Sequence, residues 1–213
     1  MSRIDINPAE TDAGAFYFFL NSVVIPRPIA WVSSRSASGV DNLAPHSFFT
    51  VSSVDPPIVQ FTSVGRKDSL NNVEATREFV VCLTPANLLE QVNATATNFP
   101  PEISEFDAVG LEREPSRRVA PPRVAASPVA LECELHETIS FGASTVVMGR
   151  VVLAAVDEET MRDGRPAVEL LRPTSRLGGN QWANVGPLTE ITRIGYHEWP
   201  GHYHAAKQAE ETE

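Results

Sequence analysis

Short apolar segments recur along the chain, and many alternate apolar with polar residues at the period of two that is typical of half-buried antiparallel strands. The clearest pair is VALECELHETISFG followed by STVVMGRVVLAAV, which predicts one long β-hairpin turning at Gly142. The other predicted strands are residues 29–34, 47–53, 58–64 and 79–84, with a last one near 191–196. Several strands in hairpin order predict a mainly β fold.

Helical periodicity is limited to short segments. A helix over 12–23 would carry its aromatic and aliphatic residues on one face, a second is expected with Asp68 or Ser69 as its N-cap, and a third is expected to cover 87–98. Residues 99–127 are rich in Pro, Arg and Glu and are expected to run over the surface. The chain has 17 prolines and only 12 glycines, which favours short elements. Together these features predict a β-barrel with peripheral helices.

The composition narrows the class of protein. Of the 213 residues, 42% are hydrophobic, which is enough for the core of one domain. The formal net charge of -10 disfavours binding to nucleic acid or anionic membranes, because phosphate contacts require clustered Lys and Arg. No apolar run approaches the ~20 residues of a membrane helix, and the N-terminus lacks the apolar core of a signal peptide. We therefore expect a soluble cytoplasmic protein.

Motifs for metals and nucleophiles are missing. Cys82 and Cys133 lie in separate apolar segments without a CxxC spacing, so two buried free thiols are expected, with one disulfide as the alternative. His202 and His204 are spaced to bind an adventitious metal ion, but no carboxylate spacing completes a metal motif. There is no GxSxG elbow, GxGxxG fingerprint or P-loop. These absences favour a bound cofactor as the source of the chemistry.

The segment GRKDS is the strongest candidate for an anion site. Arg66 and Lys67 precede a predicted helix N-terminus, whose backbone N–H groups and positive dipole end favour a phosphate, and Ser69 adds a hydroxyl. The alternative is that Asp68 only caps the helix while both cations are solvated.

The segment DNLAPHSFFT is a second candidate. Pro45 removes a backbone donor and makes Ala44 extended, so the neighbouring amides and Ser47 would face a ligand instead of another strand. The two phenylalanines that follow would point to opposite faces, one into the core and one into a pocket. The alternative is an irregular barrel rim with His46 exposed.

The segment RLGGNQWA is a third candidate. Gly178 and Gly179 would let backbone approach a flat ligand closely, with Arg176 and Trp182 on either side. An ordinary loop explains the same residues equally well.

These segments, in this order, resemble the flavin reductase-like, FMN-binding split-barrel family, which includes flavoredoxins and the reductase components of two-component monooxygenases. The resemblance runs from about residue 26 to 195. Its motifs are PRPIAWVSS, NLAPHSFFTVSSVDPPIVQF, KDSLNNVEATREFVVCL, GAS followed by MGRV, and RLGGNQWA. It implies a single domain over 1–213, with a core of about 24–195 folded as a mainly β, Greek-key split barrel with peripheral helices.

The resemblance also implies a homodimer that holds FMN noncovalently near the subunit interface. The positions that match the family around the ring and ribityl chain are Ser33, Ser34, Asn42, Ala44, Pro45 and Ser47, with Thr62 and Ser63 beside them. The positions that match around the phosphate are Arg66, Lys67 and Ser69, with Arg176, Gly178 and Gly179 closing the pocket from the same or the partner subunit.

The implied activity is transfer of electrons from NAD(P)H through FMN to a free flavin, a partner monooxygenase or another acceptor, with no catalytic side chain. One difference between this chain and the family pattern bears on whether NAD(P)H is the electron donor. Many NADH-dependent members have Gly-Asp-His where this chain has Gly142, Ala143 and Ser144. The alternative is therefore a flavoredoxin-like electron carrier or flavin-binding protein without NAD(P)H activity of its own.

Overall fold

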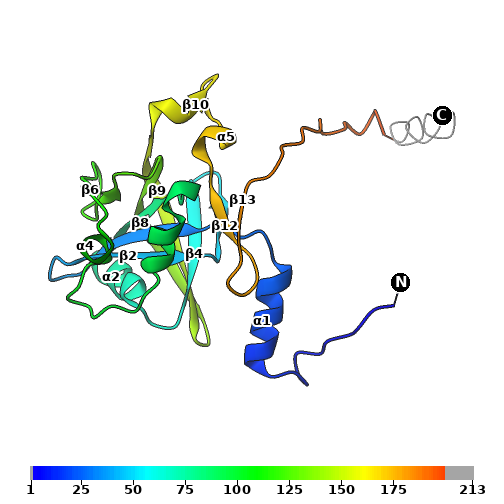
Figure 1. The fold of residues 1–213 in the computed structure, drawn as a ribbon, viewed down its shortest axis with the longest axis horizontal. Coiled ribbons are helices and arrows are strands. Elements are labelled where there is room, and N and C mark those ends of the chain that lie inside the picture. The colour runs from blue at the N-terminus through cyan, green and yellow to red at the C-terminus, as the bar shows by residue number, and fades with distance from the viewer. Residues whose placement is uncertain (1, 200–213) are drawn as a thin grey trace.

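The computed structural model describes residues 2–199 and is built around one large antiparallel sheet (Figure 1). The order of its seven strands is β2-β1-β5-β8-β9-β4-β3. The strands are β1 (Ala30–Arg35), β2 (Asp41–His46), β3 (Phe49–Ser53), β4 (Ile58–Val64), β5 (Glu78–Cys82), β8 (Val129–Phe141) and β9 (Ser144–Val156).

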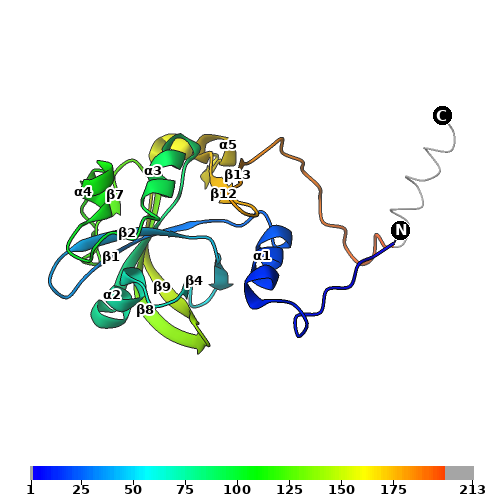
Figure 2. The same ribbon diagram turned by 60° about the horizontal axis from the view of Figure 1, so that its bottom comes forward.

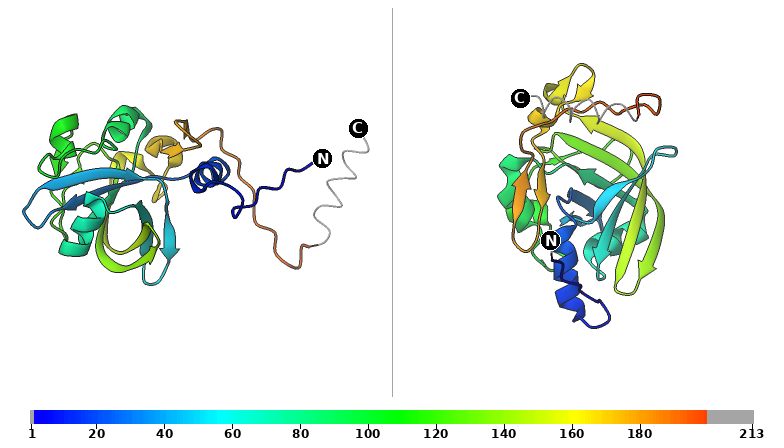
Figure 3. Two further views of the ribbon diagram at one scale, coloured as in Figure 1. Left: turned by 90° about the horizontal axis from the view of Figure 1, so that it is seen from below. Right: turned by 90° about the vertical axis from the view of Figure 1, so that its right-hand side faces the viewer.

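Short helices and three two-stranded sheets surround the main sheet. The helices are α1 (Ala13–Val23), α2 (Asp68–Thr76), α3 (Leu89–Ala94), α4 (Glu105–Val109) and α5 (Val168–Leu171), with 3-10 turns η1 (Ala86–Leu88) and η2 (Glu158–Thr160). The small sheets pair β6 (Arg113–Glu114) with β7 (Arg123–Val124), β10 (Met161–Arg162) with β11 (Arg165–Pro166), and β12 (Thr174–Arg176) with β13 (Trp182–Asn184). Figures 2 and 3 show α1 at one side of the barrel, away from α2 and α4.

The main sheet curls into a barrel because its two edge strands are joined directly. β2 and β3 lie at opposite ends of the strand order, yet only Ser47 and Phe48 separate them in sequence. The Thr62 amide donates to the Phe48 carbonyl at 2.9 Å and fastens this corner to β4. The predicted mainly β split barrel with peripheral helices is confirmed.

Two hydrophobic clusters pack on the two faces of β1, because successive side chains of a strand point to opposite sides. Ala30 and Val32 face the cluster that contains Phe61. Trp31 faces the second cluster, which contains Phe106 of α4 and is covered by α3 and α4. The segment that was expected to cross the surface therefore contributes part of the core.

The long hairpin turning at Gly142, the first helix and the strand over 58–64 form as predicted. Neither interpretation of the start of DNLAPHSFFT, a segment that faces no other strand or an irregular rim, is right, because Asp41–His46 pairs with β1 along its whole length as β2. Pro45 is tolerated there because β2 is an edge strand, whose outer side needs no ladder hydrogen bond. The next strand consequently begins at Phe49 and not at residue 47.

Two other predicted elements differ from the structure: one helix ends early and one strand does not form. The helix predicted over 87–98 ends at Ala94, because the Thr95 hydroxyl turns back to the Val92 carbonyl at 2.9 Å and accepts from the Trp31 indole at 2.9 Å. No strand forms near 191–196, because no neighbouring strand pairs with that segment within residues 2–199.

Neither a metal site nor a membrane span is found among residues 2–199. No group of three or more metal-ligating side chains comes together there, and no helix of that part is both long and apolar enough to cross a bilayer. Cys82 and Cys133 are buried and free, so the expectation of thiols is confirmed over a disulfide. The predicted adventitious pair, His202 and His204, lies outside the described residues.

Gly149 of β9 leaves no room for a side chain, and its replacement tests the barrel core. A Cβ atom there would lie 2.2 Å from Cζ of Phe79 and 3.0 Å from Cβ of Cys133. Phe79 is fully buried, so Gly149→Ala should lower the free energy of unfolding in urea by roughly 1–3 kcal/mol. Gly186→Ala, with nothing within 4 Å, should stay within about 0.5 kcal/mol of wild type. Equal losses in both variants would contradict this packing.

Candidate functional site

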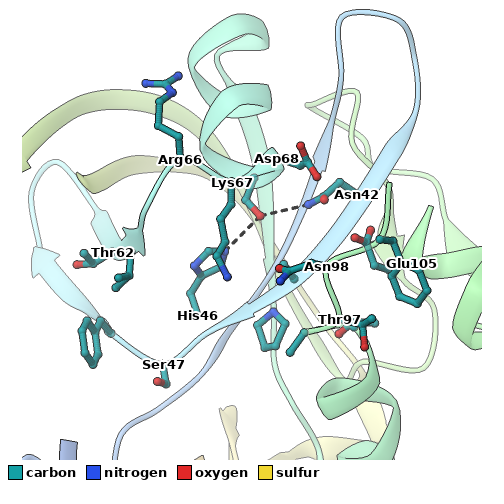
Figure 4. A pocket seen from close by; sticks show the side chains of 18 of the residues that line it. Asn42, His46, Ser47, Thr62, Arg66, Lys67, Asp68, Thr97, Asn98 and Glu105 are labelled. Atoms are coloured by element: carbon teal, nitrogen blue, oxygen red, sulfur yellow. Dashed lines mark hydrogen bonds between the residues drawn. The ribbon is translucent and has the colours of Figure 1, made fainter. Parts of the chain in front are cut away.

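A cavity of about 340 Å³ opens where the two edges of the sheet meet (Figure 4). Strand β2, the corner after it, the end of β4, the start of α2 and the segment after α3 form its walls. The lining residues are Tyr17, Asn42, Ala44, Pro45, His46, Ser47, Phe48, Thr62, Val64, Arg66, Lys67, Asp68, Ser69, Thr95, Ala96, Thr97, Asn98, Phe99 and Glu105.

Helix α2 begins at this cavity without a side-chain cap. Its N-cap residue is Lys67, and not Asp68 or Ser69 as predicted, and no side chain of residues 2–199 accepts from the amides of the first turn. Those N–H groups have no partner within the helix and carry the positive end of its dipole. This end of the cavity is therefore suited to bind an anion.

The two cations of GRKDS point in different directions. Arg66 Nε donates to Asn71 at 3.0 Å, and its NH2 lies 2.6 Å from a carboxylate oxygen of Glu74. In Figure 4, Arg66 points away from the cavity, whereas Lys67 reaches into it. Lys67 makes no ion pair with any residue from 2 to 199, so its charge is available to a ligand.

A chain of buried polar side chains runs behind the wall of the cavity. His46 Nε2 lies 3.2 Å from the Ser69 hydroxyl, to which the Asn42 amide also donates at 3.2 Å. The Asn42 amide lies 3.4 Å from the Ser34 hydroxyl, which also accepts from Asn72 of α2 at 3.2 Å. The network links β1, β2 and α2 and fixes the orientation of the side chains that face a ligand.

His46 is held neutral. It is 8% exposed, so the expectation of an exposed rim histidine is wrong, and its ring packs 4.6 Å from that of Phe61. Burial lowers the pKa of His46 to about 4; a backbone hydrogen bond with Thr62 opposes this effect and the charge of Lys67 reinforces it.

The opposite wall belongs to the segment after α3 and to α4. Figure 4 shows Thr97, Asn98 and Glu105 on this side of the cavity. One carboxylate oxygen of Glu105 accepts from the Leu43 amide at 2.8 Å, and burial raises the pKa of this carboxyl group. The edge amide at Leu43 is thus occupied by Glu105, which corrects the expectation that the amides around Pro45 all face a ligand.

Residues 22–171 match a family model described as the flavin reductase like domain, which covers more than half of the chain. The chain belongs to the flavin reductase-like family.

Similar proteins cover nearly the whole chain. A protein of Aquifex aeolicus is 37% identical over 183 residues, which are 83% of this chain and 93% of the relative. The crystal structure of nitrilotriacetate monooxygenase component B from Bacillus cereus is 33% identical, with a TM-score of 0.87 over 90% of this chain and 100% of that one. That of 2-nitrobenzoate 2-nitroreductase from Pseudomonas fluorescens is 30% identical, with a TM-score of 0.85 over 91% and 98%.

Membership of the flavin reductase-like family supports a flavin-related redox function and a flavin cofactor for this chain. Eight of the residues predicted to bind the cofactor line the cavity described above. They are Asn42, Ala44, Pro45, Ser47, Thr62, Arg66, Lys67 and Ser69. Phe48 lines the cavity while Phe49 packs against the barrel core, as predicted for the aromatic pair.

Three predicted serines stand behind this flavin reductase-like cavity and do not line it. Ser34 supports Asn42 from behind, and Ser63 donates to the Gly65 carbonyl at 2.8 Å at the turn before α2. Ser33 is fully buried on the other face of β1, and its hydroxyl has no hydrogen-bond partner among the described residues.

The predicted 176–179 loop does not line the cavity within one subunit. A Cβ on Gly178 would lie 2.8 Å from the Ser22 hydroxyl, so this glycine is explained by its close contact with α1. The Arg176 guanidinium stacks 4.6 Å from the centre of the Trp182 ring and donates to the Gly179 carbonyl at 2.8 Å. A contribution of this loop to a partner subunit's site stays a prediction.

Several lining residues were not predicted, namely Tyr17, Val64, Asp68, Thr95, Ala96, Thr97, Asn98, Phe99 and Glu105. One sequence signal could have pointed to the far wall, the run ATATNFPP. Its Thr and Asn residues and its two prolines disfavour a helix, so this segment is better suited to a loop beside a cavity. Glu105 and Tyr17 carry no such signal, because their places depend on tertiary packing.

The low pKa of His46 predicts a loss of stability in acid. The unfolded chain binds a proton near pH 6.5 and the folded chain only near pH 4, so the unfolded state binds more protons between these values. The free energy of unfolding of the flavin-free protein should therefore fall by about 3 kcal/mol as pH drops through this window. In the His46→Gln variant, the free energy of unfolding measured in urea should no longer fall by this amount over the same pH range. A variant with the same pH dependence as wild type would contradict the buried neutral histidine.

Proposed function

We propose that this chain is an FMN-binding oxidoreductase. The observation that carries the proposal is the meeting, at one end of the cavity, of the uncapped start of α2 with Lys67, which has no ion-pair partner among the described residues. FMN ends in one phosphate monoester, which fits backbone N–H groups at a helix start together with one ammonium group. Bound FMN supplies hydride and electron transfer, so the protein needs no nucleophile.

The other walls of the cavity fit the rest of FMN. Asn42, Ser47 and Thr62 offer polar groups along the path from the phosphate subsite to the sheet corner. Tyr17 and Phe48, whose ring centroids are 6.2 Å apart, provide an aromatic boundary at the other end. In this proposal Lys67 and the α2 amides hold the phosphate, while the polar residues orient the ribityl chain and the ring edge.

Absorption spectroscopy tests this assignment. Protein mixed with FMN and then desalted should keep a flavin spectrum, with one FMN per chain. A colourless protein after the same treatment would contradict FMN binding.

We also propose a homodimer, with α1 as part of its interface. Helix α1 has no buried residue in the single subunit, and large apolar side chains such as Phe18 and Leu20 are 59% and 43% exposed. A second copy is the favoured cover, because Tyr17 of the same helix lines the cavity and a partner there would enclose the ring end of the site.

Replacing Leu20 tests the dimer. Leu20→Glu should shift the protein from dimer towards monomer in sedimentation velocity, because it places a charge in an apolar contact. Ile103→Glu is the matched control, since Ile103 is equally exposed at 44% but lies outside α1, and it should leave the dimer intact. A monomeric wild-type protein at all concentrations would overturn the proposal.

The proposed electron donor is NAD(P)H, with a free flavin or another acceptor as the recipient. The hairpin tip that carries the Ala143–Ser144 departure lies beside the β4–α2 loop, because the Gly65 amide donates to the Ala143 carbonyl at 2.8 Å. The departure favours a second candidate function, a flavoredoxin-like electron carrier. Anaerobic stopped-flow mixing of the FMN-loaded protein with NADH and with NADPH separates the two, since rapid bleaching by either rejects the carrier.

A monooxygenase is the proposed protein partner. The Bacillus cereus relative with 33% identity is itself described as a monooxygenase component B. A partner of this kind would receive reduced flavin from the cavity.

A further inference from the structure

The ring of His46 has two neighbours that set its tautomer. Its Nε2 atom lies 3.2 Å from the Ser69 hydroxyl, and a backbone hydrogen bond with Thr62 favours the protonated ring. The Ser69 hydroxyl already accepts from the Asn42 amide and needs an acceptor for its own proton, so we assign the N–H of the neutral ring to Nδ1, the nitrogen that does not face Ser69. The Nε2 atom then carries a lone pair and accepts the hydroxyl proton of Ser69.

This tautomer determines what Ser69 presents to the cavity. Its hydroxyl proton is directed to His46, and one of its lone pairs accepts from the Asn42 amide at 3.2 Å. The remaining lone pair of Ser69 is an acceptor. A phosphate is also an acceptor, so the network as it stands offers it no hydrogen bond from Ser69.

The charged and titratable groups that share this cavity with His46 come from four segments. Lys67 and Arg66 precede α2, Asp68 opens it, Glu105 belongs to α4 and Tyr17 to α1. Of the two cations, only Lys67 reaches into the cavity, and it opposes a second positive charge on His46. A bound dianion beside Ser69 would instead favour protonation of His46, because an opposite charge a few ångströms away favours the charged form of an imidazole.

We propose that His46 is a positioning residue that takes up a proton when, in weakly acid solution, a phosphate monoester dianion binds beside Ser69. Protonated Nε2 then donates to the Ser69 oxygen, and the Ser69 hydroxyl turns to donate to the phosphate. The inference rests on the proposed FMN function and deepens it, since it makes recognition of the phosphate depend on a proton held by the wall of the barrel.

The pH dependence of FMN affinity follows from this coupling. The second pKa of a phosphate monoester is about 6, so a site that binds only the dianion loses about tenfold in affinity by one pH unit below that value. In the wild-type protein, proton uptake by His46 offsets this loss. Affinity for FMN should therefore stay within about threefold between roughly pH 7.5 and pH 5.

The experiment is a fluorescence titration of the flavin-free protein with FMN across this pH range, with riboflavin, which lacks the phosphate, as the control ligand. Wild type should give the flat profile for FMN, whereas His46→Gln, which cannot titrate, should lose about tenfold towards pH 5. Calorimetry of FMN binding in two buffers with different heats of ionisation should find that wild type takes up more protons at about pH 5 than His46→Gln, by a difference approaching one.

The wild-type comparison of FMN with riboflavin needs no variant, so the test survives if His46→Gln does not fold. The inference is overturned if FMN affinity falls about tenfold in wild type, or if both proteins show parallel profiles and equal proton uptake. If FMN fails to bind at every pH, the proposed function falls and this inference falls with it.

Discussion

Replacing Lys67 with glutamate should weaken FMN binding by at least about a hundredfold. Lys67 is the cation that points into the cavity, beside the uncapped start of α2. Loss of one charge-assisted hydrogen bond costs about 1.5–3 kcal/mol, or roughly 10–150-fold, and the introduced carboxylate adds repulsion of the phosphate. Titration of the flavin-free protein with FMN, followed by quenching of flavin fluorescence, measures the change.

Arg66→Gln is the matched control for this prediction. The Arg66 side chain is 63% exposed and is paired with Glu74 on the outside of α2, so the variant should change FMN affinity by only a few-fold. An effect at Arg66 as large as that at Lys67 would show that the guanidinium turns into the cavity when ligand binds. An unchanged affinity in Lys67→Glu would contradict the phosphate subsite.

Replacing Glu132 with alanine should lower the free energy of unfolding by about 3–5 kcal/mol, because it leaves the buried guanidinium of Arg123 with only the half-exposed carboxylate of Glu114 and removes the acceptor of two backbone amides. Glu132 of β8 is fully buried, and its carboxylate lies 2.5 Å from the guanidinium of Arg123, whose side chain is 5% exposed. The same carboxylate accepts from the amides of Arg117 and Arg118 at 2.9 and 2.6 Å. One side chain thus anchors a whole turn of the segment between β6 and β7.

Urea unfolding at neutral pH measures this loss, and Glu134→Ala on the same strand is the control. Glu134 pairs with Arg150 at 2.5 Å, but both side chains are about half exposed, so its removal should cost no more than about 1 kcal/mol. Similar losses for the two glutamates would show that burial does not decide the energy of these pairs.

Most strands could be predicted because they depend on local sequence patterns. The period of two around Gly142 and the proline breaks between the other strands locate most of the barrel. DNLAPH was misjudged because proline argues against a strand in general, and only the sheet order shows that Pro45 lies on an edge where it does no harm. Likewise, the N-cap was misassigned because Asp68 and Ser69 are preferred capping residues by type, whereas the observed N-cap, Lys67, is not.

The candidate site was predicted on one side and missed on the other. Motifs near the α2 start and the β2 corner are local, so residues such as Asn42 and Lys67 could be read from the chain. Glu105 reaches the cavity only because its carboxylate satisfies the edge amide of Leu43, a pairing 62 residues apart in sequence. His46 was not among the predicted site residues, because its burial and its contact with Ser69 exist only once the barrel closes.

The most direct test of the account is a paired titration of the flavin-free protein with FMN and with riboflavin at about pH 7.5, where the phosphate is a dianion. The account predicts saturable binding of one FMN per chain, at least about tenfold tighter than riboflavin, because only FMN reaches the α2 start and Lys67. Equal affinities for the two flavins, or no binding of FMN, would contradict it.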